Sequence, residues 1–182
     1  DREQAVKAAL EGLEKSPTEQ PWGQGLEAIF QQDEFRGKRL RAEERVQFYQ
    51  KCRDYLTRGG ELCRQALERH PKHDSLTLGL ELITNALALA SLETGDTAGA
   101  KRLAQSQLAA NTDTTSWNYG NIIHKANALL GRAALRDGDK KAAVDFLMKA
   151  GATPGSPQLN SFGPDFTFAR EMLEAGETNA VL

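Results

Sequence analysis

Two Gly-Asp pairs constrain the fold more than any other feature of this sequence. Gly95-Asp96 and Gly138-Asp139 each follow an alanine-rich segment with helical spacing of apolar residues, and a second such segment follows each pair. A glycine at this position ends one helix, and the aspartate caps the next one. The small residues Ala100 and Ala143 follow the two pairs and allow antiparallel helices to approach closely. The pattern predicts helical hairpins.

No segment shows the alternation of a half-buried strand, and β-branched residues are scarce, so we predict an all-α fold. The length of 182 residues suits a single helical domain over 1–182. We expect its parts in this order: a less regular N-terminal section over 1–40, a degenerate helix pair over 41–74, hairpins over 75–110 and 117–150, a docked Gly/Pro-rich loop over 151–163 and a capping helix over 164–176.

The degenerate pair depends on a break at Gly59-Gly60. Two adjacent glycines cost about 2 kcal/mol in a helix interior relative to alanine, so we predict a second helix from Glu61 that ends before Pro71. Cys52 and Cys63 would then face each other across a hairpin. On one continuous helix they would lie on the same face about 16 Å apart, which is beyond disulfide reach. We interpret them as a buried, reduced pair.

The segment "GATPGSPQLNSFGP", Gly151 to Pro164, is rich in glycine and proline and is predicted to lie across the helix that begins near Trp117. We expect His124 and Asn127 on that helix to hydrogen-bond its peptide groups, because buried peptide groups require partners. Leu159 and Phe162 would be its apolar anchors.

Gly120 and Gly131 lie on the same row of that helix as His124 and Asn127. Glycine is a poor choice for a helix interior, so its presence indicates that something packs closely against the backbone there.

The window from Lys125 to Ala150 resembles a tetratricopeptide repeat, on the residues Leu130-Gly131, Ala134, Gly138-Asp139, Ala143 and Ala150. It departs from the family pattern at Asn127, where the family has a tryptophan, and at Leu147, where it has a large aromatic residue. The Gly-Asp pairs also lie further apart than the roughly 34 residues of one repeat. The chain is similar to bacterial tetratricopeptide-like proteins of undefined function. The resemblance implies a right-handed stack of hairpins that binds a protein or peptide on its concave surface.

We expect the binding residues on polar positions of the inner helices and beside the loop: Glu81, Asn85, Trp117, Asn121, His124, Lys125, Asn127 and Arg132. The alternative is a small-molecule or enzymatic site at the His124 and Asn127 face, beside the loop over 151–164. His124 has no acidic or histidine partner at helical spacing, so we predict no metal there.

The charge balance, 23 Lys and Arg against 25 Asp and Glu, does not indicate a nucleic-acid partner. A basic run from Arg36 to Arg41 is flanked by acidic residues and is interpreted as a solvated, mixed-charge face, with a phosphate or acidic-partner patch as the alternative. No apolar run approaches the roughly twenty residues of a membrane span, so we expect a soluble chain. The chain begins at Asp1, which we interpret as removal of a preceding segment. Cytoplasmic location and export after processing both stay open, as does the oligomeric state.

Motifs for catalysis or for a cofactor are not found: there is no Gly-rich phosphate loop, nucleophile elbow or paired-carboxylate pattern. We therefore expect a binding protein that uses no cofactor, with catalysis by residues assembled in space as the alternative.

Overall fold

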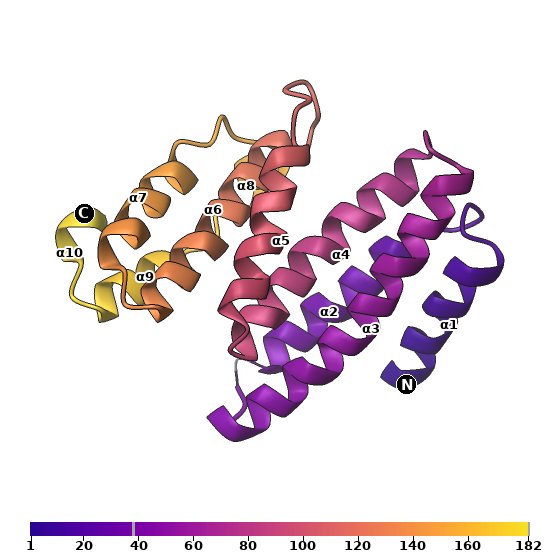
Figure 1. Ribbon diagram of the computed structural model, residues 1–182, viewed down its shortest axis with the longest axis horizontal. Helices are drawn as coiled ribbons and strands as arrows, with labels where there is room; N and C mark the ends of the chain where they lie inside the picture. Colours follow the sequence, from indigo (N-terminus) through magenta and orange to yellow (C-terminus); the bar gives the residue numbers. More distant parts are fainter. Residues whose placement is uncertain (38, 182) are drawn as a thin grey trace. The chain divides into compact units, whose positions relative to one another are not determined.

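The computed structural model describes residues 1–37 and 39–181, and this part of the chain is all-α, with ten helices and no strand (Figure 1). The all-α prediction is confirmed. The chain divides into two compact units, residues 1–95 and 96–182, where the sequence predicted a single domain. The predicted hairpin over 75–110 is divided by this boundary, because its first helix belongs to unit 1 and its second to unit 2. Each unit is described by itself.

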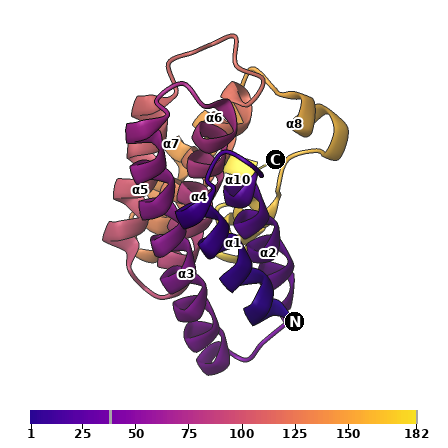
Figure 2. The same cartoon turned by 90° about the vertical axis from the view of Figure 1, so that its right-hand side faces the viewer.

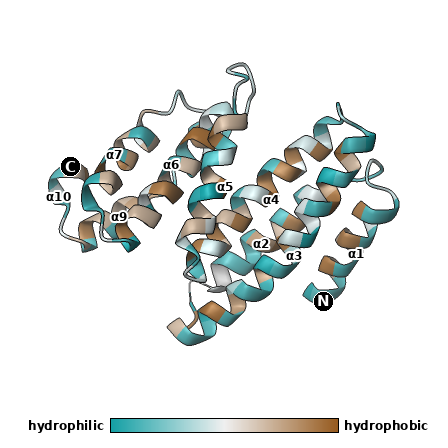
Figure 3. Cartoon of the chain, viewed as in Figure 1, coloured by the Kyte–Doolittle hydropathy of each residue, from teal (hydrophilic) through white to brown (hydrophobic). Residues whose placement is uncertain are grey.

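Unit 1 holds α1 (Arg2–Lys15), α2 (Trp22–Gly37), α3 (Ala42–Arg69) and α4 (Asp74–Glu93). α3 packs along α4, α2 packs on both, and α1 packs on α2 and α3. The section over 1–40 is therefore more regular than predicted. α2 begins at Trp22, whose indole N–H donates to the Ser16 carbonyl oxygen at 3.0 Å and whose ring packs against Gly12. Figure 3 shows hydrophilic and hydrophobic residues alternating around these helices, as amphipathic packing requires.

α3 is continuous through Gly59-Gly60, so the predicted break and the helix pair over 41–74 are wrong. Both glycines are buried, and a Cβ on Gly59 would lie 2.5 Å from Leu26 Cδ1 and 3.4 Å from Ile83 Cδ1. The missing side chains let Leu26 and Ile83 pack against the α3 backbone, and this packing offsets the low helix propensity of glycine. Cys52 and Cys63 are free and buried on this one helix, not on opposite arms of a hairpin.

α2 and α4 meet at another pair of glycines. A Cβ on Gly23 would lie 2.7 Å from Gly79 Cα, and a Cβ on Gly79 would lie 3.1 Å from Gly23 Cα. Beside this crossing, the Gln24 side-chain amide donates to the carbonyl oxygen of Ser75 at 3.2 Å. The two backbones therefore touch directly, and no side chain separates them.

α4 is long and apolar enough to cross a membrane by the criteria of length and composition, which corrects the expectation that no segment reaches this size. In the structure it is a core helix of unit 1, packed against α2 and α3 with residues such as Leu76, Ile83 and Leu92 buried. A buried core helix satisfies the same two criteria.

The exposed side chain of Arg41, in the predicted basic run, pairs with that of Glu44 at 2.9 Å. This pairing agrees with a solvated, mixed-charge face at Arg41. Lys38, in the same run, lies outside the described residues.

Unit 2 holds α5 (Thr97–Ala110), α6 (Tyr119–Arg136), α7 (Lys140–Gly151), α8 (Pro157–Phe162), α9 (Thr167–Glu174) and α10 (Thr178–Val181). α6 packs between α5 and α7, α9 contacts α6 and α7, and α10 contacts α9. α6 and α7 pack against each other over the range of the predicted hairpin 117–150. Gly138 has a φ of +81°, and the Asp139 carboxylate accepts the backbone N–H of Ala142 at 3.0 Å. Gly95 and Asp96 repeat this geometry, with a φ of +84° and a bond from the Gly99 N–H at 2.8 Å.

The Gly/Pro-rich segment is docked at its start. Thr153 Oγ1 donates to the Gly120 carbonyl oxygen at 2.6 Å, and the Gly155 carbonyl lies against Gly120 Cα, where a side chain would clash. Beyond it, α8 has no buried residue, and Phe162 is 88 % exposed, so its predicted role as an anchor is wrong. Figure 2 shows α8 within the excursion that connects α7 to α9.

The capping helix is shorter than the predicted 164–176. α9 begins at Thr167, because Asp165 accepts the Thr167 N–H at 2.8 Å, and ends before Gly176, whose φ is +87°. α10 follows.

Candidate functional site

An open pocket of about 620 Å³ lies in unit 2, between α6, α7 and the segment that leads into α9. Its lining is mostly apolar, and the polar residues on it are His124, Thr153 and Asp165. The apolar part of the lining consists of Ala128, Leu147, Met148, Ala150, Gly151, Ala152, Pro164, Phe166, Phe168, Ala169, Ala180 and Val181. An apolar hollow with a few polar groups is the usual composition of a ligand site.

Two contacts hold α9 on α6, and one of them involves Phe168, which lines this pocket. Gly131 leaves room for the Phe168 ring, which a Cβ at position 131 would overlap, and Phe168 is 2 % exposed. Arg132 makes a bidentate ion pair with Glu171, with both nitrogen to oxygen distances at 2.8 Å. The prediction that something packs against Gly120 and Gly131 is therefore confirmed, by the Gly155 backbone at the first and by Phe168 at the second.

His124 is the buried polar group of the pocket. Its side chain lies on α6, is 9 % exposed, and places Nδ1 3.2 Å from the Ala150 carbonyl oxygen. A carbonyl only accepts, so in the neutral imidazole Nδ1 carries the proton and Nε2 has the free lone pair. Nε2 is buried and has no hydrogen-bond partner within the described residues. The site therefore contains one unused acceptor.

The neighbouring asparagines are satisfied locally. The Asn121 side-chain amide donates to Asn118 Oδ1 at 3.0 Å, and the Asn127 amide donates to the Ile123 carbonyl oxygen of its own helix at 2.8 Å. The prediction that His124 and Asn127 bond the loop is therefore wrong for both residues. For His124 the partner is Ala150, in the last turn of α7. Asn121 and Asn127 are both 6 % exposed and are structural groups beside the pocket.

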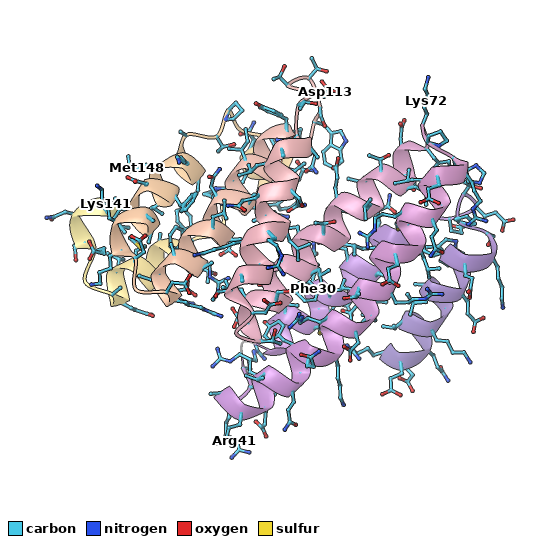
Figure 4. The ribbon with its side chains drawn as sticks, viewed as in Figure 1. Phe30, Arg41, Lys72, Asp113, Lys141 and Met148 are labelled. Carbon is cyan, nitrogen blue, oxygen red and sulfur yellow. The ribbon has the colours of Figure 1, made fainter. Side chains whose placement is uncertain are left out.

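Two large apolar side chains of the pocket lining are unusually exposed. Met148 on α7 is 61 % exposed and Phe166, just before α9, is 69 % exposed. Figure 4 labels Met148, and also Lys141 on the same helix. Asp165 is the one charged residue on the described lining, and its carboxylate accepts from the backbone N–H and hydroxyl of Thr167 at 2.8 and 2.6 Å.

The remaining predicted binding residues have different places. Trp117 is 50 % exposed before α6, and Lys125 is half-buried on α6. Arg132 pairs with Glu171 of α9 at 2.8 Å. Glu81 and Asn85 lie half-buried on α4 of unit 1. Of the eight predicted residues, the pocket is lined by His124 alone; Met148, Phe166 and Asp165 were not predicted.

A buried polar cluster in unit 1 was also not predicted from the sequence. Asp33 on α2 is 1 % exposed and accepts from Arg2 Nε at 2.8 and 2.7 Å and from the Tyr55 hydroxyl at 3.3 Å. Cys52 Sγ lies 3.7 Å from Asp33 Oδ2. Burial, and then the Asp33 carboxylate, raises the pKa of Cys52 to about 12, and burial raises the pKa of Tyr55 well above its ordinary range. The two groups therefore stay protonated near neutral pH, and a protonated thiol is a weak nucleophile. The helical spacing of Leu26, Phe30 and Asp33 was the signal that could have found it.

Unit 1 has a hollow of its own, of about 420 Å³, between α1 and α3. Acidic and basic side chains line it in equal number, and some of them pair with one another: Lys7 with Glu11 at 3.8 Å and Arg58 with Glu14 at 3.4 Å. It is a weaker candidate than the apolar pocket of unit 2.

Among the described residues, no group of three His, Cys, Asp or Glu side chains is placed to hold a metal ion. No protein-family model, no curated protein and no solved structure matches this sequence. The fold and site define an all-helical protein with sequentially packed helices and an apolar pocket in unit 2, and the likeness to tetratricopeptide repeats stays a resemblance.

Proposed function

We propose that this chain is a non-catalytic interaction module, built as a right-handed stack of antiparallel hairpins of the tetratricopeptide kind, that binds a peptide or protein partner. The sequential packing of α5, α6 and α7 and the Gly-Asp turn between α6 and α7 support this architecture. Stacked hairpins offer extended surfaces that suit such partners. The proposal includes no cofactor and no nucleic acid.

One observation carries the proposal: the apolar pocket of unit 2 has Met148 and Phe166 on its lining, exposed at 61 % and 69 %. Exposed apolar side chains that gather beside a hollow are typical of ligand-binding grooves and protein interaction sites. Methionine is flexible and polarisable, and it adapts to the shape of a bound side chain. We therefore assign the pocket to an apolar side chain of the partner.

Two features support a non-catalytic role. Nδ1 of His124 is bonded to a main-chain carbonyl, whereas a catalytic histidine is usually oriented by a carboxylate. The Thr153 hydroxyl, which lies on the same pocket, is committed to the Gly120 carbonyl oxygen. Neither side chain therefore has the arrangement of an activated nucleophile and its base.

The second candidate function is a site for a free small molecule at His124. The unused Nε2 acceptor favours it, since a buried polar atom without a partner is costly in a protein that binds nothing there. The two candidates differ in whether affinity grows when the ligand is extended into a peptide.

A random-peptide phage display selection against the purified protein tests the proposal. We expect enriched peptides to share a large apolar or aromatic residue, and to lose binding to a variant that carries both Met148→Glu and Phe166→Glu. Lys141→Glu, a charge change at an exposed residue of α7 outside the pocket lining, is the matched control and should retain binding. Enriched peptides that bind the double variant as well as the original protein would contradict the proposal, as would a selection without enrichment.

A further inference from the structure

We infer that the unit 2 pocket accepts an aromatic side chain that carries one hydrogen-bond donor, tyrosine or tryptophan, with His124 Nε2 as the acceptor. This inference rests on the proposed function, because it names the side chain through which a peptide partner enters the pocket. It assigns a chemical class of ligand that neither the exposure of Met148 nor that of Phe166 determines.

The polar part of the inference starts from the hydrogen bond of His124 to α7. Nδ1 is held 3.2 Å from the Ala150 carbonyl oxygen, so the neutral tautomer that fits this contact has its proton on Nδ1. Nε2 then presents a lone pair, is buried and has no partner in the described part of the chain. A ligand that brings a hydroxyl or an indole N–H satisfies this acceptor, whereas a purely apolar ligand leaves it unsatisfied.

The aromatic character of the ligand is inferred from the apolar residues that line the pocket. Ala128 and Ala150 are small, and Leu147 and Phe168 supply apolar surface, in a pocket whose volume of about 620 Å³ exceeds that of a single aromatic ring. Aromatic rings bury a large apolar area and contact methionine sulfur favourably. Nε2 is covered by neighbouring atoms, so a donor reaches it only when side chains of the lining shift.

The charges of the site select for a neutral donor. Asp165 is the charged residue on the described lining, and it is already engaged by Thr167, so a phosphate or carboxylate ligand would meet a like charge. A lysine ammonium would have to leave water for mostly apolar walls, which is costly for a charge without a dedicated partner. A phenol or an indole avoids both costs.

The test uses side-chain analogues on the whole protein: 4-methylphenol for tyrosine, 3-methylindole for tryptophan and toluene for phenylalanine. Binding is followed in ¹⁵N-labelled protein by backbone amide shifts of 147–153 and 165–169, and by the ¹⁵N resonance of His124 Nε2. We expect 4-methylphenol to bind about five- to tenfold more tightly than toluene, the contribution of one buried hydrogen bond. Only the two donor-bearing probes should move the Nε2 resonance.

His124→Leu should reduce the preference for 4-methylphenol over toluene to one or below, and Lys141→Glu should leave it unchanged. Because the wild-type comparison of probes needs no variant, the inference stays testable if His124→Leu does not fold. Equal binding of 4-methylphenol and toluene with an unmoved Nε2 resonance would overturn the inference and leave the proposed function standing. Absence of any shift with all three probes would also overturn it, while the peptide selection judges the proposed function separately.

Discussion

The crossing of α2 and α4 gives a prediction whose size follows from the coordinates. Gly23→Ala would place a methyl carbon 2.7 Å from Gly79 Cα, whereas nonbonded carbon atoms prefer about 3.5–4.0 Å. The two helices would have to separate by about 1 Å, because the methyl carbon is fixed to the α2 backbone and the atom it meets belongs to the α4 backbone. Overpacking of this kind costs typically 1–3 kcal/mol. The gain in helix propensity is at most about 1 kcal/mol.

We therefore expect Gly23→Ala to lower the free energy of unfolding of unit 1 by about 1–2 kcal/mol. Gly79→Ala should cost less, since its Cβ would lie 3.1 Å from Gly23 Cα. Gly25→Ala is the matched control: it lies on the same helix with nothing within 4 Å of its Cβ, and it should stabilise unit 1 by about 0.5–1 kcal/mol.

Urea unfolding measures these differences, with Trp22 fluorescence as the reporter of unit 1 in a Trp117→Phe background. The expected order of stability is Gly25→Ala, then the parent protein, then Gly79→Ala, then Gly23→Ala. If Gly23→Ala stabilised the unit as much as Gly25→Ala, the direct backbone contact of α2 and α4 would be refuted.

Two further predictions concern the buried cluster of unit 1. Arg2→Ala leaves the Asp33 carboxylate buried without its cation and should destabilise unit 1 by about 3 kcal/mol. Arg58→Ala removes an exposed ion pair and should cost about 0–1 kcal/mol in the same urea titration. Equal losses of stability in the two variants would contradict the buried charge pair. Burial raises the pKa of Cys63 to about 11, and burial with the nearby carboxylate raises that of Cys52 to about 12, each from an ordinary value of 9.0. The unfolded thiols ionise first as the pH rises, so the stability that the two buried thiols contribute is fully present below about pH 9. It is lost between about pH 9 and 12, by up to about 1.4 kcal/mol per pH unit for each thiol. A Cys52→Ala/Cys63→Ala variant should show a shallower loss of Tm over this range, and an unchanged slope would show that the thiols do not contribute.

The Gly-Asp turns could be predicted because their determinants are local. A left-handed glycine and a capping aspartate act within a few residues of the turn, and both Gly95-Asp96 and Gly138-Asp139 have the predicted geometry. The packing at Gly120 and Gly131 was predictable for a related reason, since glycine in a helix interior needs a compensating contact.

The prediction of a helix break at Gly59-Gly60 is wrong because the contacts that offset the low helix propensity of these glycines are tertiary. Glycine ends a helix at other positions of this chain, but at this position it lets Leu26 and Ile83 pack against the α3 backbone. These two partners are distant in sequence. The pocket was predicted only through His124. Its other polar and apolar members, Asp165 and Phe166, come from a segment whose path depends on how α9 docks, which the local pattern does not determine.

The Asp33 carboxylate also bears on how α1, α2 and α3 select their alignment. Apolar faces tolerate sliding, since one leucine can replace another in a groove with little loss. The carboxylate does not, because the Arg2 guanidinium and the Tyr55 hydroxyl reach it from two other helices at one relative offset. A shift by a single helical turn would leave the carboxylate buried among apolar side chains without its partners. One polar side chain therefore disfavours misaligned packings of these helices that hydrophobic contacts alone would leave nearly equal in energy.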